Sequence, residues 1–215
     1  MDGNGRWAKS IGQSRQHGHK IGSSRVYEIF KTCTELGCNT ATFFAMSSEN
    51  MHRNDEETEF ISQLLEISIN EHFEELIKNE IKFKVIGDTS ILSADILQVI
   101  EHAEHETENF TKYKLNIAYN YGGQWDIINS VNRALANNEP INQKTLSKYL
   151  TTHSDYPDLI VRTGGHKRLS NFMLWQAAYS ELIFIDTLWP DFTQKELTSI
   201  YQDYQSIKRK FGKVD

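Results

Sequence analysis

Residues 40–46 read TATFFAM, residues 55–78 read DEETEFISQLLEISINEHFEELIK, and residues 83–86 read FKVI. The first and third segments are short apolar runs of the kind that form buried strands. The middle segment places its apolar side chains along one broad face of a helix, so it predicts a long amphipathic helix. A strand, a helix and a second strand in this order favour an α/β fold with a largely parallel sheet.

The same alternation continues on both sides of this segment. Ahead of it, residues 20–36 carry apolar side chains at helical spacing, and Gly37 is suited to end that helix. Behind it, we expect strands at residues 114–119, 159–161 and 182–185, and helices over 93–108, from 123 to about 136, within 136–157, and over 194–210. No connection is long enough to argue for a domain boundary, so we predict a single domain over residues 1–215.

The composition excludes several classes of protein. A hydrophobic fraction of 39% and a charged fraction of 24% are those of an ordinary globular protein. The net charge of −6 argues against a nucleic-acid binder, so a phosphate-bearing partner would need a local basic pocket. The sequence has no signal peptide and no apolar run long enough to span a bilayer, so we expect a cytoplasmic protein. Cys33 and Cys38 lack a metal-type set of partners and are interpreted as reduced packing residues.

A first candidate site covers residues 2–19. Gly3 and Gly5 let the backbone approach a ligand closely, and Asp2 offers a hard oxygen ligand for magnesium. Donors for phosphate oxygens follow at Arg6, Arg15 and His19. The alternative is a solvated, glycine-rich turn, which the composition of this segment favours when it is taken alone.

A second candidate site follows the predicted strand at residues 40–46. Its sequence, SSENMHR over residues 47–53, supplies neutral hydrogen-bonding groups and a guanidinium at Arg53. The alternative is an N-cap region for the long helix, with Asn54 or Asp55 as the cap. Both interpretations can hold together.

A third candidate site follows the predicted strand at residues 159–161. Arg162 is followed by two glycines and then by His166, Lys167, Arg168 and Ser170. Backbone N–H groups and guanidinium groups in such a loop are suited to binding an anion. The alternative is a basic surface loop, but a loop that binds no anion gains little by clustering like charges.

Other phosphate chemistry finds less support. The sequence has no Walker motif, no G-x-G-x-x-G, no H-E-x-x-H and no aspartate-rich D-D-x-x-D motif. A hydrolase or another phosphate-ester binder would explain the glycines and arginines, but the sequence offers no evident pair of nucleophile and base.

The motifs taken together resemble the signatures of the cis-prenyltransferases (undecaprenyl diphosphate synthase and isoprenyl transferases), in order and over nearly the whole chain. They are Asp2-Gly3-Asn4-Gly5-Arg6-Trp7-Ala8, Gly18-His19, Ser47-Ser48-Glu49-Asn50, Gly87-Asp88, Asn120-Tyr121-Gly122-Gly123, Trp125-Asp126, Arg162-Thr163-Gly164-Gly165, Arg168, Ser170-Asn171-Phe172 and Trp189-Pro190-Asp191-Phe192.

The resemblance implies a fold and a reaction. The fold would be a central, mostly parallel sheet flanked by helices, with an elongated hydrophobic tunnel, in a subunit of a homodimer. The reaction would be a Mg²⁺-dependent condensation of isopentenyl diphosphate onto an allylic prenyl diphosphate primer, typically farnesyl diphosphate. The product would be a long-chain polyprenyl diphosphate such as undecaprenyl diphosphate, a cell-wall lipid carrier. Because that product is insoluble in water, we expect peripheral contact with the inner face of the membrane.

The resemblance also assigns roles to single residues. Asp2 and Glu181 match the magnesium-linked carboxylates, so Asp2 counts as catalytic, and Asn50 matches the residue often proposed for proton removal. A neutral amide is a poor base, so the Asn50 assignment is positional. The remaining matches are substrate contacts: Gly3, Asn4, Gly5, Arg6, Trp7, Arg15, His19, Ser47, Ser48, Glu49, Met51, Arg53, Arg162, Arg168, Leu169 and Ser170.

Several positions depart from the family pattern. His166 stands where a glutamate is usual, Met51 where an aromatic residue is expected, Met46 where phenylalanine is common, and Asn54 where proline is common. Relatives also carry an apolar strand directly before the aspartate, so we expect that the translation start lies upstream and that this sequence is truncated. These departures leave a second hypothesis open, in which the chain is a catalytically impaired relative that acts as a binding or accessory subunit.

Overall fold

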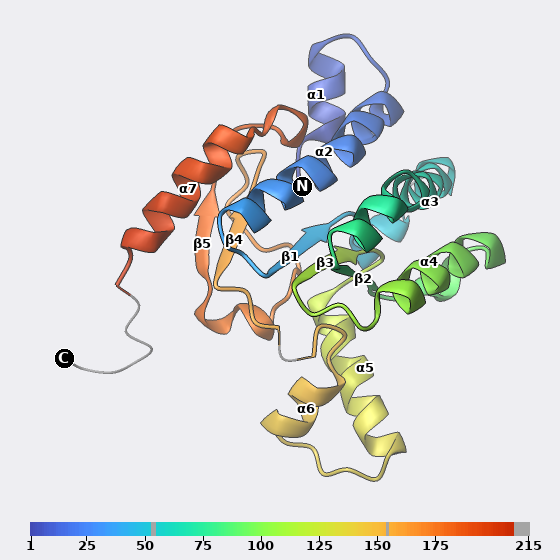
Figure 1. The fold of residues 1–215 in the computed structure, drawn as a ribbon. Coiled ribbons are helices and arrows are strands. Elements are labelled where there is room, and N and C mark those ends of the chain that lie inside the picture. Colours follow the sequence, from blue (N-terminus) through green and yellow to red (C-terminus); the bar gives the residue numbers. More distant parts are fainter. Residues whose placement is uncertain (53–54, 154, 209–215) are drawn as a thin grey trace.

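The computed structural model describes residues 1–52, 55–153 and 155–208, and over these residues it is an α/β fold (Figure 1). Its strands are β1 (Thr40–Phe44), β2 (Ile81–Ile86), β3 (Tyr113–Ala118), β4 (Leu159–Arg162) and β5 (Glu181–Phe184). Its helices are α1 (Asn4–Ser10), α2 (Arg15–Glu35), α3 (Asp55–Lys78), α4 (Ala94–Thr107), α5 (Gly123–Ala136), α6 (Gln143–Tyr149) and α7 (Gln194–Ser206). Every strand pair among the described residues is parallel, so the prediction of an α/β fold with parallel strands flanked by helices is confirmed.

The strands of the described residues form two sheets rather than the one central sheet that was predicted. β3 lies between β1 and β2 in a three-stranded sheet, and β4 pairs with β5 in the other. Within this part of the chain, the facing edges of β1 and β4 share no ladder of hydrogen bonds. A cavity of about 1010 Å³ lies between them, lined on one side by residues of β1 and on the other by residues of β4. The two edges are therefore too far apart to pair directly.

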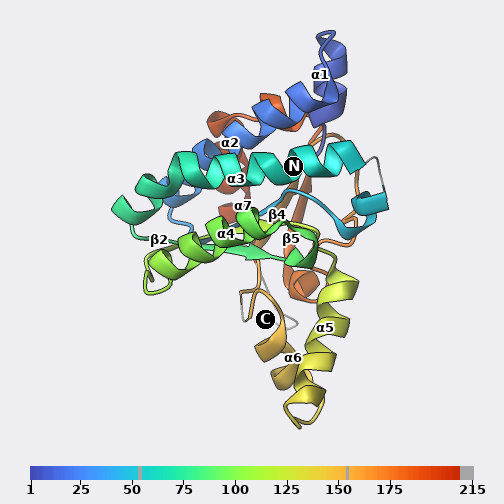
Figure 2. The ribbon, with the colours of Figure 1, turned by 90° about the vertical axis from the view of Figure 1, so that its right-hand side faces the viewer.

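The helices cover the three-stranded sheet unequally (Figure 2). α2 and α3 lie side by side over one face of it, and α4 packs along β2. α7 packs against α2 beside the two-stranded sheet. α5 and α6 pack on each other and project away from the sheets together. No helix in the described part of the chain is long and apolar enough to cross a bilayer.

The main core lies between the three-stranded sheet and the pair α2 and α3. Alternation along β2 explains why: Ile81, Phe83 and Val85 are buried on the helix side, while Lys82 and Lys84 between them face the other way and are only partly buried. The helices contribute apolar side chains at helical spacing, namely Ile29 and Phe30 of α2 and Leu65, Ile69, Leu76 of α3.

The predicted element boundaries agree with the structure within a few residues. α3 spans the predicted residues 55–78, and the last helix begins at Gln194 as predicted but ends at Ser206, before residue 210, which lies outside the described residues. Gly37 follows α2 with φ +89°, a left-handed conformation that glycine adopts at little cost. The helix α1 was not predicted, because Gly3 at its N-cap, Gly5 within it and its short length favour a turn.

Candidate active site

The backbone of Asp2 is tied to the end of β4 by one side chain. The Thr163 hydroxyl accepts a hydrogen bond from Asp2 N–H at 2.9 Å and donates one to the Asp2 carbonyl oxygen at 2.8 Å. Trp189 N–H donates to the same carbonyl at 3.0 Å. Asp2 therefore lies at the carboxyl end of a strand, the usual place for ligand-binding groups in open α/β sheets.

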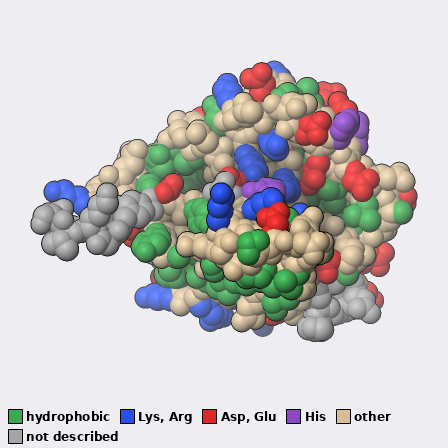
Figure 3. Space-filling view, turned by 90° about the horizontal axis from the view of Figure 1, so that it is seen from below, with side chains coloured by type: hydrophobic (Ala, Val, Ile, Leu, Met, Phe, Trp, Pro, Cys, Tyr) green, Lys and Arg blue, Asp and Glu red, His purple; other side chains and the backbone are tan. Residues whose placement is uncertain are grey.

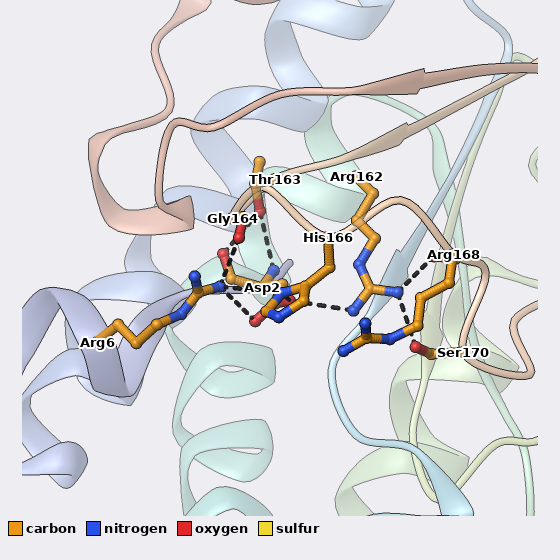
Figure 4. A network of polar contacts seen from close by, with 8 residues as sticks. All are labelled: Asp2, Arg6, Arg162, Thr163, Gly164, His166, Arg168 and Ser170. Atoms are coloured by element: carbon orange, nitrogen blue, oxygen red, sulfur yellow. Dashed lines mark hydrogen bonds and ion pairs between the residues drawn. The ribbon is translucent and has the colours of Figure 1, made fainter.

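Three cationic or potentially cationic side chains surround the Asp2 carboxylate (Figure 4). Its oxygens lie 3.3 Å from an Arg6 nitrogen, 3.1 Å from an Arg162 nitrogen and 3.0 Å from His166 Nδ1. Partial burial alone would raise the pKa of Asp2, but the hydrogen bond from Arg162 and the charge of Arg6 outweigh it and leave that pKa below its ordinary value. The carboxyl group is thus ionised at neutral pH and held among positive charges.

The loop after β4 arranges the cations of the third candidate segment. Arg162 donates to the Ser170 hydroxyl at 2.7 Å and to the Arg168 carbonyl oxygen, so one guanidinium spans the loop from its start to its end. Arg6 donates to the Gly164 carbonyl oxygen at 2.7 Å. Gly164 has φ +85°, and a side chain there would meet Arg6, so the tight turn needs glycine. The segment is an ordered cationic loop and not only a basic surface.

Helices α1 and α2 cross closely enough to fix the glycine-rich start of the chain. A Cβ atom on Gly18 would lie 2.2 Å from the Asn4 carbonyl oxygen, and one on Gly22 would lie 2.2 Å from Asn4 Oδ1. Asn4 Oδ1 is also a buried acceptor with no hydrogen-bond partner among the described residues. A buried acceptor of this kind at the cavity wall is suited to a donor from a ligand or from water.

Arg15 and His19 of α2 share a carboxylate that was not predicted as part of the site. Glu57 Oε1 lies 3.0 Å from Arg15 and 3.0 Å from His19 Nε2. Burial alone would raise the pKa of Glu57, but the hydrogen bond with His19 and the charge of Arg15 outweigh it and lower that pKa. The ion pairs orient both donors toward the space beside Asn4, which all three residues line.

The loop after β1 is positioned by the neighbouring strand end. Ser47 forms an isolated parallel bridge with Tyr121, and Ser48 N–H donates to the Tyr121 carbonyl oxygen at 3.0 Å. The Asn50 N–H donates to the Ser47 carbonyl oxygen at 3.0 Å, which closes a turn. Glu49 accepts a 2.6 Å hydrogen bond from Asn171, so this loop also contacts the end of the cationic loop.

Most of the predicted site residues line one cavity, the space of about 1010 Å³ described above. They are Asp2, Gly3, Asn4, Gly5, Arg6, Arg15, His19, Ser47, Asn50, Arg162, Arg168, Leu169 and Ser170, and His166 and Met46 line it as well. Three segments far apart in the sequence therefore meet in one place. The Trp7 indole instead donates to Asp191 at 2.7 Å and stacks on His17. Arg53 lies outside the described residues, and the Met51 side chain is not described.

A second, apolar cavity opens from the same region between α2 and α3. It has a volume of about 100 Å³, and Met1, Asn4 and His19 line both cavities. Its wall continues through Val26 and Tyr27 of α2 and, on α3, through Leu65, Ile69 and Leu76. The cationic site thus adjoins an apolar space, and the two share part of their walls.

The residues present fit a magnesium ion only in part. Asp2 supplies an ionised, partly exposed carboxylate, and Mg²⁺ commonly takes one or two carboxylates together with substrate phosphates. Glu181 pairs with Leu159 at the start of β4, whereas Asp2 contacts Thr163 just after its end. Leu159 and Thr163 are four residues apart along extended backbone, a rise of about 13 Å, so one chain does not bring Glu181 to Asp2. In the described part of the chain, no group of three or more His, Cys, Asp or Glu side chains could hold a metal.

Comparison with known proteins agrees with this geometry. The family described as "Putative undecaprenyl diphosphate synthase" matches residues 1–212. The chain is 40% identical over 215 residues to an isoprenyl transferase of Fusobacterium nucleatum, covering 100% of this chain and 94% of that protein. The chain belongs to the cis-prenyltransferase family.

Two further relatives show how broad this likeness is. The chain is 39% identical over 220 residues to the farnesyl-diphosphate-specific ditrans,polycis-undecaprenyl-diphosphate synthase of Shewanella oneidensis, covering 99% of this chain and 80% of that one. The structure of lavandulyl diphosphate synthase from Lavandula x intermedia, in complex with dimethylallyl diphosphate, superimposes with a TM-score of 0.93 at 30% identity, covering 99% and 95% of the two chains. This cis-prenyltransferase is accordingly an isoprenyl transferase.

Several residues that shape this cis-prenyltransferase site were not predicted from the sequence. Thr163, Glu57 and Asn171 each position a predicted site residue and touch it directly. Thr163 and Asn171 lie inside the quoted motifs, so the motif residues beside them could have indicated that they belong to the site. Glu57 is one of many carboxylates on α3, and nothing in the sequence separates it from the solvated ones.

Proposed function

We propose that this chain is a magnesium-dependent cis-prenyltransferase that condenses isopentenyl diphosphate onto an allylic diphosphate primer, with farnesyl diphosphate as the preferred primer. The product is a long-chain polyprenyl diphosphate such as undecaprenyl diphosphate. Both substrates join a dianionic or trianionic head to an apolar tail. A protein that binds them needs a cationic site that leads directly into an apolar one.

One observation carries this proposal. The cavity that holds Arg6, Arg162 and Arg168 adjoins the apolar cavity between α2 and α3, and Asn4 and His19 line both. A diphosphate bound among the arginines would place its hydrocarbon tail at the mouth of the apolar cavity. Each CH₂ group buried there contributes about 0.8 kcal/mol, so a growing chain is held more tightly with every addition.

The residues have distinct tasks in this reaction. Arg6 and the donors on α2 bind the primer diphosphate, whose negative charge increases as the allylic C–O bond breaks. Arg162, Arg168 and Ser170 bind the diphosphate of isopentenyl diphosphate. Bound magnesium, held by Asp2 and phosphate oxygens, would neutralise part of the leaving-group charge. Asn50 lines the same cavity, where a neutral amide can orient a substrate but is a poor base.

The apolar cavity is the start of the proposed product tunnel. At about 100 Å³ it is small, and α2 and α3 are linked across it by a 2.6 Å hydrogen bond between Ser23 and Ser68. A long product requires that these two helices move apart. Such a product is insoluble in water, so we propose that the protein is cytoplasmic and releases it at the inner face of the membrane.

We also propose that one further β-strand lies between β1 and β4. Both edges face the larger cavity, and the described residues pair with no strand there, which is costly unless another strand, a side chain or water satisfies the backbone groups. A strand in this place would join the two parallel sheets into one and would lead directly to Asp2. The test is an extended protein with an apolar segment ahead of Met1, which should raise both stability and turnover.

A homodimer is the proposed assembly. Exposed apolar side chains gather on the face seen from below, beside a hollow that holds charged side chains (Figure 3). On α5 and just after it, Ile128, Leu135 and Ile141 are 61%, 58% and 48% exposed. An apolar surface of this kind is typical of a subunit contact. Replacing Leu135 by lysine should shift sedimentation from dimer toward monomer.

The decisive experiment is a condensation assay. Protein is incubated with Mg²⁺, farnesyl diphosphate and labelled isopentenyl diphosphate, and the products are separated by chain length. Long-chain polyprenyl diphosphate supports the proposal. If the extended protein binds both diphosphates but forms no product, the chain is instead an accessory subunit, the alternative that the change to His166 favours.

A further inference from the structure

The two cysteines of the chain lie next to each other at the junction of α2 and β1. Cys33 is in the last turns of α2, and Cys38 lies two residues before β1. Cys38 N–H donates to the Cys33 carbonyl oxygen at 2.9 Å, so the backbone itself folds one cysteine onto the other. Both residues are half-buried and line the cavity between β1 and β4.

The surroundings make the two thiols chemically different. The hydrogen bond from Cys33 lowers the pKa of Cys38 to about 7, and a second one from Tyr201 of α7 acts in the same direction against partial burial and the charge of Asp158. The hydrogen bond to Cys38, together with burial, raises the pKa of Cys33. Tyr204, which packs on Tyr201, is a further titratable group that lines this cavity. These directions favour Cys38 as the attacking thiolate and Cys33 as the thiol that resolves it.

We propose that Cys33 and Cys38 form a redox-active dithiol that reacts with peroxides and closes to an intramolecular disulfide. A thiolate attacks one oxygen of the peroxide, the O–O bond breaks, and Cys38 becomes a sulfenic acid while the other oxygen leaves as hydroxide or alkoxide. Cys33 then attacks the Cys38 sulfur, the S–O bond breaks, and water leaves with the thiol proton. The dithiol loses two electrons and two protons, and the peroxide is reduced.

The position of the pair gives this oxidation a structural consequence. The disulfide would bridge the turn around Gly37, which connects α2 to β1. α2 carries Arg15 and His19 near its other end, and β1 leads into the loop with Ser47 and Asn50. A cross-link at this turn would restrict how far α2 can move relative to the sheet. The proposal does not depend on which prenyl diphosphate the enzyme makes.

The test is mass spectrometry of the reduced protein after brief exposure to hydrogen peroxide. The expected product is a chain that has lost two hydrogen atoms, whose peptide map links Cys33 to Cys38 and which dithiothreitol returns to its original mass. In Cys33→Ser the reaction should stop at the Cys38 sulfenic acid, which dimedone traps. In Cys38→Ser both the disulfide and the dimedone adduct should be absent.

A pH profile provides the second readout. The alkylation rate of Cys38 by iodoacetamide should rise with a midpoint at about pH 7. Cys33→Ser should move that midpoint toward the value of an ordinary thiol, about 8.5. Free thiols that survive the peroxide unchanged would overturn the proposal. So would disulfides that form only between chains, or a Cys38→Ser variant that is oxidised as fast as the wild type.

Discussion

The hydroxyl group of Thr163 binds the backbone of Asp2 at both its N–H and its carbonyl oxygen, at 2.9 and 2.8 Å. Thr163 is only 2% exposed, so water does not compete for these hydrogen bonds. Asp2 thereby takes its position from a residue 161 places later in the chain. The carboxylate that we assign to magnesium depends on that anchor.

Thr163→Val should therefore remove the hydroxyl that anchors Asp2 while leaving the Asp2 carboxylate itself unchanged. Valine has nearly the same shape but leaves the Asp2 N–H without its partner and leaves the Asp2 carbonyl with only the Trp189 N–H, which should lower the free energy of unfolding by about 1–3 kcal/mol. We also expect kcat to fall, because Asp2 is no longer held in place. Urea unfolding and the condensation assay measure the two effects, and Thr163→Ser, which keeps the hydroxyl, is the control. A valine variant with the kcat of the wild type would contradict the positioning role.

Asp2→Asn should reduce turnover on the order of 10²-fold while leaving the fold intact. The amide cannot neutralise Arg6, Arg162 and His166, which surround this position. Pyrophosphate should consequently bind the variant at least as tightly as the wild type in the absence of metal, and Mg²⁺ should no longer raise the affinity. Calorimetric titration with and without Mg²⁺ checks this. Asp95→Asn, which changes an exposed carboxylate on α4, is the matched control. Unchanged turnover would show that Asp2 is misassigned.

Gly18→Ala should displace α1 and with it Arg6. The new Cβ atom would lie 2.2 Å from the backbone oxygen of Asn4, and overpacking of this kind costs about 1–3 kcal/mol. We expect a lower free energy of unfolding and a higher KM for the allylic diphosphate. Gly12→Ala is the control, because a Cβ there meets nothing within 4 Å although the backbone has φ +70°. That variant should lose stability without a change in KM.

The sequence predicted the fold class because local patterns carry it. α3 has its apolar residues on one face and was predicted with its observed bounds. β2 alternates between buried and partly buried side chains and was predicted without its first two residues. The division into two sheets could not be predicted in this way. The division depends on which strand edges pair with each other. Neither the sequence of β1 nor that of β4 indicates that these two strands do not pair.

The site residues could be predicted where several motifs occur together. They could not be predicted where the position of a side chain depends on one residue far away in the sequence. Glycines and arginines next to strand ends indicated the cavity that now contains Asp2 and Arg162. Neither pattern nor spacing indicated that Glu57 would bind Arg15 and His19. The distance of Glu181 from Asp2 could not be predicted either, because it depends on the register between β4 and β5.

Glu57 should make the stability of the protein depend on pH in the acid range. Its pKa is lower in the folded state than its ordinary value of about 4.3, because the contacts with His19 and Arg15 outweigh burial. Its contribution is therefore complete above the unfolded pKa and is lost as the pH falls through the folded value. Between about pH 5 and pH 3 the unfolding free energy should fall more steeply for the wild type than for Glu57→Gln. Glu59→Gln, an exposed neighbour on α3, should follow the wild type, and parallel curves for all three proteins would refute the role of Glu57.

Asp126, part of the motif that helped to identify the family, should prove structural rather than catalytic. It is fully buried, and its carboxylate accepts hydrogen bonds from the Tyr121 hydroxyl, the Gln176 amide and the Thr151 N–H at 3.0, 3.1 and 2.9 Å. Asp126→Ala removes the acceptor of three donors, two of them on the buried side chains of Tyr121 and Gln176, so the free energy of unfolding should fall by about 3 kcal/mol or more. Asp126→Asn keeps one acceptor and should lose less. Because Asp126 does not line the cavity, folded Asp126→Ala assayed at low temperature should keep its kcat. A folded variant without activity would instead place this carboxylate in the reaction.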